Sequence, residues 1–231
     1  MQPVLDYYLV FPEAWDGDLS VPPGGIAVEE FVFAGDHTAA GVDGAVWTAA
    51  DGGWWSSADF SRAVRADQGF RALVVAVRRG DAEAAYRRLG GGVLPAEAML
   101  RGYFGDRLAL PGSAPLLLTP PEVPDGFREK RRYRILFAGE LGEDQVGRLR
   151  QVWGMAPADA RARVLGTAHL RVAGDAFTWE LRRIGPGVAL CVDVTACLGD
   201  PPGEAVGVLL RELMAVVRLE GLVPVTIERF A

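Results

Sequence analysis

Residues 166–198, GTAHLRVAGDAFTWELRRIGPGVALCVDVTACL, decide the fold of the second half of the chain. Apolar and polar residues alternate here in three runs, which is the pattern of strands that bury one face. Turn residues separate the runs, Gly174-Asp175 after the first and Gly185 to Val188 after the second. The stretch therefore predicts three antiparallel strands joined by tight turns. Their apolar residues are Ala168, Leu170, Val172, Phe177, Trp179, Leu181, Val192, Val194 and Ala196.

The two turns also predict the register of these strands. A turn centred on Gly174-Asp175 places Val172 opposite Phe177, and a turn centred on Pro186-Gly187 places Leu181 opposite Val192. All the apolar residues then lie on one face, whereas a slip of one residue would move a whole set to the other face. The opposite face carries three predicted polar rows: Arg171-Thr178-Thr195, His169-Glu180-Asp193 and Thr167-Arg182-Cys191.

The segments around this meander predict an α+β arrangement. We expect a strand at 133–138 and a helix at 143–153 before it, then a helix at 204–219 and a strand at 223–230 after it. The order β-α-β-β-β-α-β describes an antiparallel sheet with two helices on one face, in the manner of a ferredoxin-like fold with one extra strand. The other face of such a sheet stays open unless something covers it.

The first half of the chain also mixes strands and helices. Ser56 or Ser57 can cap the first helix, because a serine hydroxyl accepts from the free amides of the first turn. Residues 34–53 are rich in Gly, Ala and Asp and predict a loop or a ragged hairpin around 45–48. The other expected strands are at 5–11, 26–33, 72–77 and 116–119, and the expected helices at 56–66, 80–89 and 95–103.

A proline-rich stretch marks the expected boundary between two lobes. Pro120, Pro121 and Pro124 can continue neither a helix nor a central strand, so they indicate a linker. This predicts an N-terminal lobe at 1–119, a linker at 120–126 and a C-terminal lobe at 127–231. Similar sequences after Ala72 and after Arg134 leave a duplication of the two lobes open, since chance similarity competes with it in a chain rich in Ala and Gly.

Composition limits the kind of protein. The chain has 231 residues, of which 50% are hydrophobic, and this predicts a globular protein. No apolar run reaches the roughly 18 residues of a spanning helix, and the N-terminus lacks the basic start of a signal peptide, so we expect a cytoplasmic protein. Lys130 is the only lysine and asparagine is absent, a bias typical of a GC-rich bacterial genome.

The net charge of −6 argues against a general nucleic-acid binder, which needs a basic face to displace counterions. One basic run departs from this balance, and a phosphate site there competes with a solvated edge or an ion pair between lobes. No phosphate-binding loop, dinucleotide motif, nucleophile elbow or zinc pattern occurs, so we expect no cofactor and no metal. The basic run comprises Arg128, Lys130, Arg131, Arg132 and Arg134.

The row His169-Glu180-Asp193 is the best candidate for chemistry. Neighbours across strands lie about 5 Å apart, close enough for a His–Glu hydrogen bond and for two carboxylates to shift each other's pKa. The alternative is an ordinary polar sheet face in which Arg171 and Arg182 neutralise the acidic pair. Cys191 is a weaker candidate nucleophile because it lies diagonally from His169.

The aromatic pair Trp54 and Trp55, beside a helix start, is a candidate recognition site, because aromatic residues supply much of the energy at binding hot spots. Its competing interpretation is that one of the two is core. Taken together, the sequence favours a non-catalytic acidic binding protein that contacts another protein, of the inhibitor, immunity or adaptor type. The alternative is an enzyme or small-ligand binder around the polar row, so whether the chain is an enzyme stays open. The candidate binding residues are His169, Glu180, Asp193, Arg171, Arg182, Trp54 and Trp55.

Overall fold

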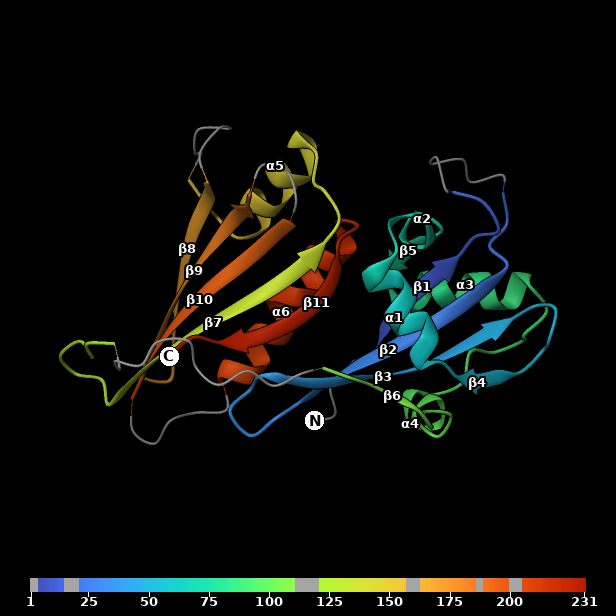
Figure 1. Cartoon of the computed structure of the whole chain (residues 1–231), viewed down its shortest axis with the longest axis horizontal. Coiled ribbons are helices and arrows are strands. Elements are labelled where there is room, and N and C mark those ends of the chain that lie inside the picture. Colours follow the sequence, from blue (N-terminus) through green and yellow to red (C-terminus); the bar gives the residue numbers. More distant parts are fainter. Residues whose placement is uncertain (1–3, 15–20, 111–120, 157–162, 186–188, 200–204) are drawn as a thin grey trace. The chain divides into compact units, whose positions relative to one another are not determined.

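The computed structural model describes residues 4–14, 21–110, 121–156, 163–185, 189–199 and 205–231. Within these ranges the chain is a mixed α+β protein with two antiparallel sheets and six helices. It divides into two compact units (Figure 1): residues 1–32 with 40–111, and residues 33–39 with 112–231. No helix in the described ranges is both long and apolar enough to cross a membrane.

The sheet of the first unit has the strand order β4-β3-β2-β1-β5, and β6 pairs with β3. Its strand β3 corrects the loop expected at 34–53, because residues 39–48 form a ten-residue strand; the alternative, a hairpin around 45–48, is present in part, since residues 45–47 pair with β4. The strands are β1 (Asp6–Val10), β2 (Gly25–Phe33), β3 (Ala39–Thr48), β4 (Trp54–Ser56), β5 (Val74–Val77) and β6 (Arg107–Ala109).

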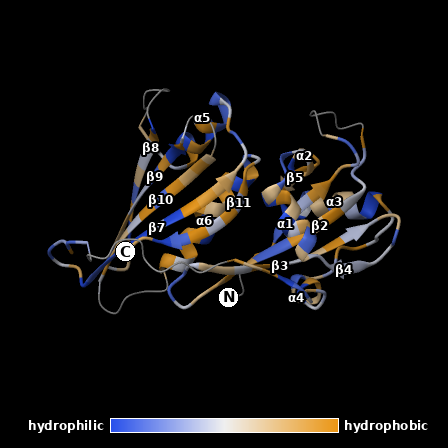
Figure 2. Cartoon of the chain, in the orientation of Figure 1, coloured by the Kyte–Doolittle hydropathy of each residue, from blue (hydrophilic) through white to orange (hydrophobic). Residues whose placement is uncertain are grey.

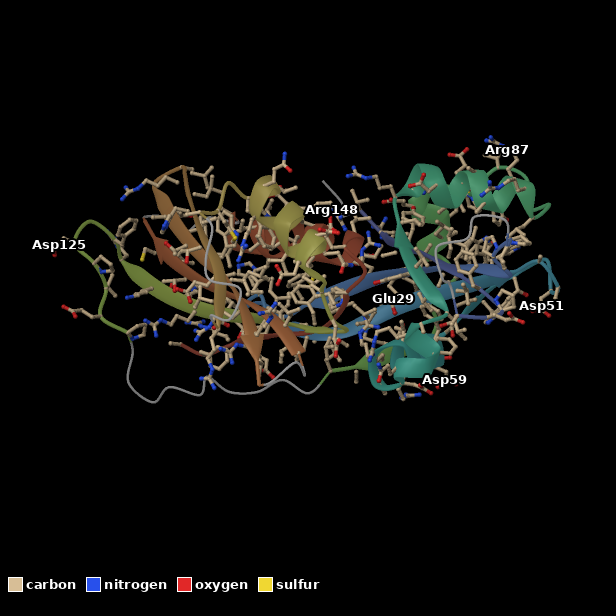
Figure 3. The ribbon with its side chains drawn as sticks, turned by 90° about the horizontal axis from the view of Figure 1, so that it is seen from above. Glu29, Asp51, Asp59, Arg87, Asp125 and Arg148 are labelled. Carbon is tan, nitrogen blue, oxygen red and sulfur yellow. The ribbon has the colours of Figure 1, made fainter. Side chains whose placement is uncertain are left out.

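Four helices belong to this unit. The first begins where the sequence predicts, because the Ser57 hydroxyl accepts a hydrogen bond from the Phe60 amide at 3.1 Å. Trp47 and Tyr86 lie in the main core, with ring centroids 4.7 Å apart. Glu29 is fully buried and pairs with Arg65, and Figure 3 shows it within the sheet while Asp51 and Arg87 lie at the surface. The helices are α1 (Ala58–Ala66), α2 (Gln68–Arg71), α3 (Arg79–Arg88) and α4 (Glu97–Arg101).

The second unit is built on a five-stranded sheet with the order β11-β7-β10-β9-β8. Both of its helices, α5 and α6, lie on one face of the sheet (Figure 1). Hydrophobic and hydrophilic residues alternate along the strands, as Figure 2 shows, so one face is core and the other polar. The elements are β7 (Glu129–Ala138), α5 (Glu143–Val152), β8 (Val164–Val172), β9 (Asp175–Ile184), β10 (Ala189–Leu198), α6 (Ala205–Leu219) and β11 (Val223–Arg229).

The register of one hairpin is confirmed and that of the other is wrong. Leu181 pairs with Val192 and Trp179 with Val194 between β9 and β10, as predicted. Between β8 and β9 the predicted register is wrong by two residues, because Val172 pairs with Asp175 rather than with Phe177. The turn of that hairpin is therefore Ala173-Gly174, with φ angles of 49° and 88°. Positive φ at both central residues is the geometry of the two-residue turn that matches strand twist.

The core of the second unit lies between the sheet and its two helices. Trp179 is 6% exposed, which confirms its predicted burial, and its ring meets that of Trp153 edge-on at 6.3 Å. Val206, Leu209 and Leu213 are among the residues that α6 buries. The predicted helical spacing of apolar residues on α6 thus matches the buried face.

Two further expectations fall in or near undescribed segments. The expected strand at 116–119 and the turn centre Pro186-Gly187 lie outside the described residues.

The basic run is expected to lie before a strand. In the structure most of it lies within β7. Alternation along β7 sends Tyr133 to the core and leaves Arg132 exposed.

Candidate functional site

The polar face of the second unit's sheet is the candidate site. We call it the open face and define it by the side chains that face away from α5 and α6 on β7, β8, β9 and β10, together with Phe230 after β11. No described helix packs on it. Residues paired across strands share a face, so the pairings arrange this face in rows. The four complete rows are Lys130-Cys197-Ala176-Arg171, Arg132-Thr195-Thr178-His169, Arg134-Asp193-Glu180-Thr167 and Leu136-Cys191-Arg182-Val164.

The middle of the open face is hollowed. The hollow has a volume of about 390 Å³, at the lower end of the range for small-molecule sites. Hydroxyl groups of Thr178 and Thr195 and the ring of Phe230 line it beside charged side chains. Its charged residues are Arg132, Arg134, Glu180, Arg182 and Asp193.

An arginine–carboxylate network occupies one side of the hollow. Asp193 accepts two hydrogen bonds from Arg134, at 2.6 and 2.7 Å, and a longer one from Arg182 at 3.3 Å. The two-bond contact with Asp193 raises the pKa of Arg134, although partial burial opposes this. The Arg134 guanidinium also lies over the Phe230 ring, 4.7 Å from its centroid. Asp193 is therefore held by two arginines, as expected for a bidentate, partly buried pair.

Glu180 has fewer contacts with arginine side chains than Asp193 has. It lies opposite Asp193, as predicted, and its contact with Arg182 is a longer ion pair at 3.6 Å. Its side chain is 37% exposed, so it can accept further hydrogen bonds from a bound molecule. The sequence predicts that Arg171 and Arg182 neutralise the acidic pair. Arg182 does so, whereas Arg171 lies opposite Ala176, two rows away from Glu180 and Asp193.

The structure does not bring His169 opposite Glu180, which corrects the predicted row. The two-residue shift between β8 and β9 places His169 opposite Thr178, and its Nδ1 lies 2.9 Å from the threonine Oγ1. The residue opposite Glu180 on β8 is Thr167. The histidine and two carboxylates that an acid–base site would need are thus not in one row.

Cys191 is not poised as a nucleophile. Its side chain is fully buried in the sheet, and its sulfur lies 3.7 Å from an oxygen of Asp193. Burial, together with that carboxylate, raises the pKa of the thiol to about 12. Since the thiolate is the reactive species, this thiol is inert near neutral pH. The described residues also contain no group of three or more His, Cys, Asp or Glu side chains able to hold a metal ion.

The tryptophan pair belongs to the first unit and not to the open face. Trp54 packs between Tyr86 and Tyr103, at 5.9 and 6.4 Å between centroids. Trp55 is 37% exposed. The pair therefore divides into one packed and one surface residue, as the competing interpretation held.

Sequence reasoning missed three residues of the hollow: Arg132, Arg134 and Phe230. The signal was present, because Lys130, Arg132 and Arg134 recur at every second position, which is the period of one strand face. Because the basic run was interpreted as an edge before the strand, this spacing was not assigned to a strand face.

The first unit contains a different hollow. It has a volume of about 490 Å³ and is lined mainly by apolar groups, among them Phe11, Val46, Phe60 and Phe70. Two pairs of ionisable groups lie inside this unit: Arg65 donates to both oxygens of Glu29 at 2.9 Å, and the Tyr7 hydroxyl donates to Glu97 at 3.1 Å. Neither pair opens onto the apolar hollow.

Comparison of the chain with protein-family models, with curated proteins and with solved structures found no match.

Proposed function

We propose that the chain is a non-catalytic binding protein that recognises another protein through the open face. One observation carries the proposal: on this face, hydroxyls, carboxylates, guanidiniums and an aromatic ring converge on one hollow. A mixture of arginine, aromatic and hydrogen-bonding groups around a depression is typical of the energetic centre of a binding surface.

The chemistry of the same residues supports binding rather than catalysis. A general acid or base needs a proton-transfer partner within hydrogen-bond reach, but His169 contacts Thr178 and Asp193 is occupied by two arginines. The protonated thiol of Cys191 offers no nucleophile. A satisfied network of this kind fixes side chains in place for recognition.

The proposal includes the setting expected from the sequence: an acidic cytoplasmic protein of bacterial origin, with two lobes joined at 120–126. It also includes the ferredoxin-like description of the C-terminal lobe. The two helices on one face of an antiparallel sheet support that description. The lobe departs from that description in one respect, which is the direction of β8. Since β7 and β10, β10 and β9, and β9 and β8 each pair antiparallel, the added strand makes β8 antiparallel to β7.

A second candidate function is the binding of a small ligand in the hollow. Its volume of about 390 Å³ favours this candidate, because small-molecule sites begin at roughly 300 Å³. The carboxylate of Glu180 is partly exposed and can accept hydrogen bonds, and the Arg132 side chain is exposed. Contacts with these two groups would orient such a ligand.

Partner capture with matched variants tests the proposed function. Thr178→Arg places a bulky charge in the hollow, and Val208→Arg places the same group on α6, where Val208 is 52% exposed. We expect a partner captured from native lysate by wild-type protein to be retained by Val208→Arg and lost by Thr178→Arg. Equal melting midpoints would show that both variants fold.

Retention of the partner by Thr178→Arg would contradict the proposal. A protein that captures no macromolecule, yet gains thermal stability from a small-molecule fraction in a Thr178-dependent way, would favour the second candidate, since a ligand that binds only the folded state stabilises it.

A further inference from the structure

We propose that the partner binds through an acidic peptide segment that crosses the strands at one end of the open face. This inference rests on the proposed function and names the chemistry of its partner. We call this end the basic end and define it by two rows, Lys130-Cys197-Ala176-Arg171 and Arg132-Thr195-Thr178-His169.

The basic end contains permanent cations and no carboxylate. The basic side chains are those of Lys130, Arg132 and Arg171, and none of them pairs with a carboxylate of a described residue. Arg132 and Arg171 are exposed. The neighbouring Glu129 does not neutralise this end, because its side chain pairs with Arg131 and Arg229.

Two of the three acidic residues one row away are already compensated, and the third, Glu228, lies opposite Arg134 on β11. Asp193 pairs with Arg134 and Arg182, and Glu180 with Arg182. The positive charge of the basic end is thus not cancelled within its own rows, and Glu228, on the edge strand β11, adds one carboxylate to the next row. Although the chain has a net charge of −6, the basic end presents a local positive surface, which favours an anionic partner there.

The spacing of the cations favours a peptide over one small anion. Arg132 on β7 and Arg171 on β8 are separated by three strand spacings of about 4.8 Å each, and by one row of two residues, about 6.6 Å, along the strands, which places their backbone positions roughly 16 Å apart. For one carboxylate or phosphate to contact both cations, the two arginine side chains would have to extend fully toward each other over the floor of the sheet. An extended peptide of about five residues spans this distance at about 3.3 Å per residue.

The floor between the cations suits a peptide that crosses it. Thr195, Thr178 and Ala176 are small side chains, each partly exposed, and two of them carry hydroxyls that can bond peptide carbonyls or carboxylates. The hollow beside Arg132 can take one side chain of the segment. We therefore expect carboxylates at both ends of the segment, with one inserted side chain between them.

Peptide titration tests this inference. The probe is an acetylated and amidated pentaglutamate, compared with the matching pentaglutamine, and binding is followed by amide chemical shifts of Thr178 and Thr195. We expect saturable, salt-sensitive binding of pentaglutamate alone, because only charged contacts release counterions and are screened by salt. The double variant Arg132→Gln/Arg171→Gln should weaken binding by about tenfold or more, as expected for the loss of charged hydrogen bonds.

A second double variant controls for net charge. Arg87→Gln/Arg88→Gln removes two exposed arginines from α3 in the first unit and should leave the affinity within about twofold, because these arginines are not part of the open face and a change in net charge alone is screened by salt. Equal binding of pentaglutamine, full affinity in Arg132→Gln/Arg171→Gln, or equal loss in the control would overturn the inference. Displacement of the peptide by equimolar inorganic phosphate would also overturn it and indicate a single-anion site.

The two proposals can fail separately. If pentaglutamate does not bind but partner capture still depends on Thr178, the acidic-segment inference is wrong and the binding function stands. If pentaglutamate binds as expected but Thr178→Arg retains the captured partner, the function assigned to the open face is wrong.

Discussion

Trp179 contributes to stability through its position opposite Trp153. It is buried on the helix side of the sheet, where its ring packs edge-on against the Trp153 ring. We expect Trp179→Ala to lower the free energy of unfolding by about 3–5 kcal/mol, the range for removing a large side chain from a core. Thermal or urea unfolding measures this. Trp55→Ala, at a partly exposed position, is the control, and an equal effect of both changes would show that Trp179 is not a core residue.

The two cysteines should react at very different rates. Cys191 is buried with a thiol pKa raised to about 12, whereas Cys197 is partly exposed. We expect iodoacetamide at pH 8 to modify Cys197 first and Cys191 only after unfolding, as read by mass spectrometry of peptides. Modification of Cys191 in the native protein at a similar rate would contradict the burial of its thiol.

The same shift has a consequence for stability. The unfolded thiol ionises near pH 9 while the folded thiol stays protonated to about pH 12, so the folded state binds more protons between these values. The contribution of Cys191 to stability is therefore present below pH 9 and lost as the pH rises toward 12. Cys191→Ala should remove this part of the alkaline dependence.

At the scale of elements, the meander shows what alternation can and cannot predict. The pattern of apolar residues assigned the side of the sheet correctly, because a shift by one residue would bury polar side chains, although Leu170 and Val172 at the end of β8 are exposed and not part of the core. A shift by two residues keeps every side chain on its face, so the pattern does not exclude it. This is the error that occurred between β8 and β9, and it separated His169 from Glu180.

The missing information was in the turn. The sequence favours Gly174-Asp175 as the turn centre, whereas the structure uses Ala173-Gly174 and holds Ala173 at a φ of 49°. Alanine rarely adopts this conformation, because its Cβ approaches a carbonyl oxygen. Gly174 follows Ala173 with a φ of 88°, so the two residues together form the tight turn that sets the observed register.

This turn gives a prediction about the β8–β9 hairpin. Ala173→Gly should raise the free energy of unfolding by about 0.5–1 kcal/mol, because glycine adopts positive φ without steric cost. Gly174→Ala, at a φ of 88°, should lower it. Chemical unfolding of the two variants and the wild type measures both effects. A turn centred on Gly174-Asp175 would instead make Ala173→Gly destabilising, since glycine weakens a strand.

The strand β3 was missed for a different reason. Its glycines and alanines have low strand propensity, but close packing requires small residues there. A Cβ on Gly44 would lie 3.1 Å from the Val28 carbonyl oxygen, and one on Gly41 would lie 2.6 Å from the Arg107 side chain. Tertiary contact thus selects these residues, and a single sequence does not reveal such contacts.

At the scale of the whole chain, the proline-rich stretch remains the expected linker. Within the described residues, 122–126 are all exposed, and Figure 3 shows Asp125 at the surface. We expect limited proteolysis to cut at 122–126 before the other described interior segments, since proteases need exposed, extensible backbone. Mapping the fragments by mass spectrometry tests this. Earlier cutting inside β7 or β3 would contradict the division into lobes.

The compact units also differ from a simple division of the chain in two, because residues 33–39 belong with the second unit. In that unit the Tyr133 hydroxyl donates to the Asp36 carbonyl oxygen at 2.9 Å, and the Arg211 guanidinium lies 4.2 Å from the centroid of the Phe33 ring. A fragment that begins at residue 121 therefore lacks part of its own unit. The linker composition predicts where the chain is accessible, but this long-range contact has no sequence signal.

Comparing Tyr133→Phe in two backgrounds tests the contribution of residues 33–39. In the full chain the change removes a buried hydrogen bond and should cost about 0.5–1.5 kcal/mol of unfolding free energy. In the fragment 121–231 the acceptor Asp36 is missing, so the same change should cost less, and the fragment should melt below the full chain. Calorimetry of the four proteins gives both comparisons. An equal cost in both backgrounds would mean that Asp36 does not accept this bond in solution, and the second unit would then fold without residues 33–39.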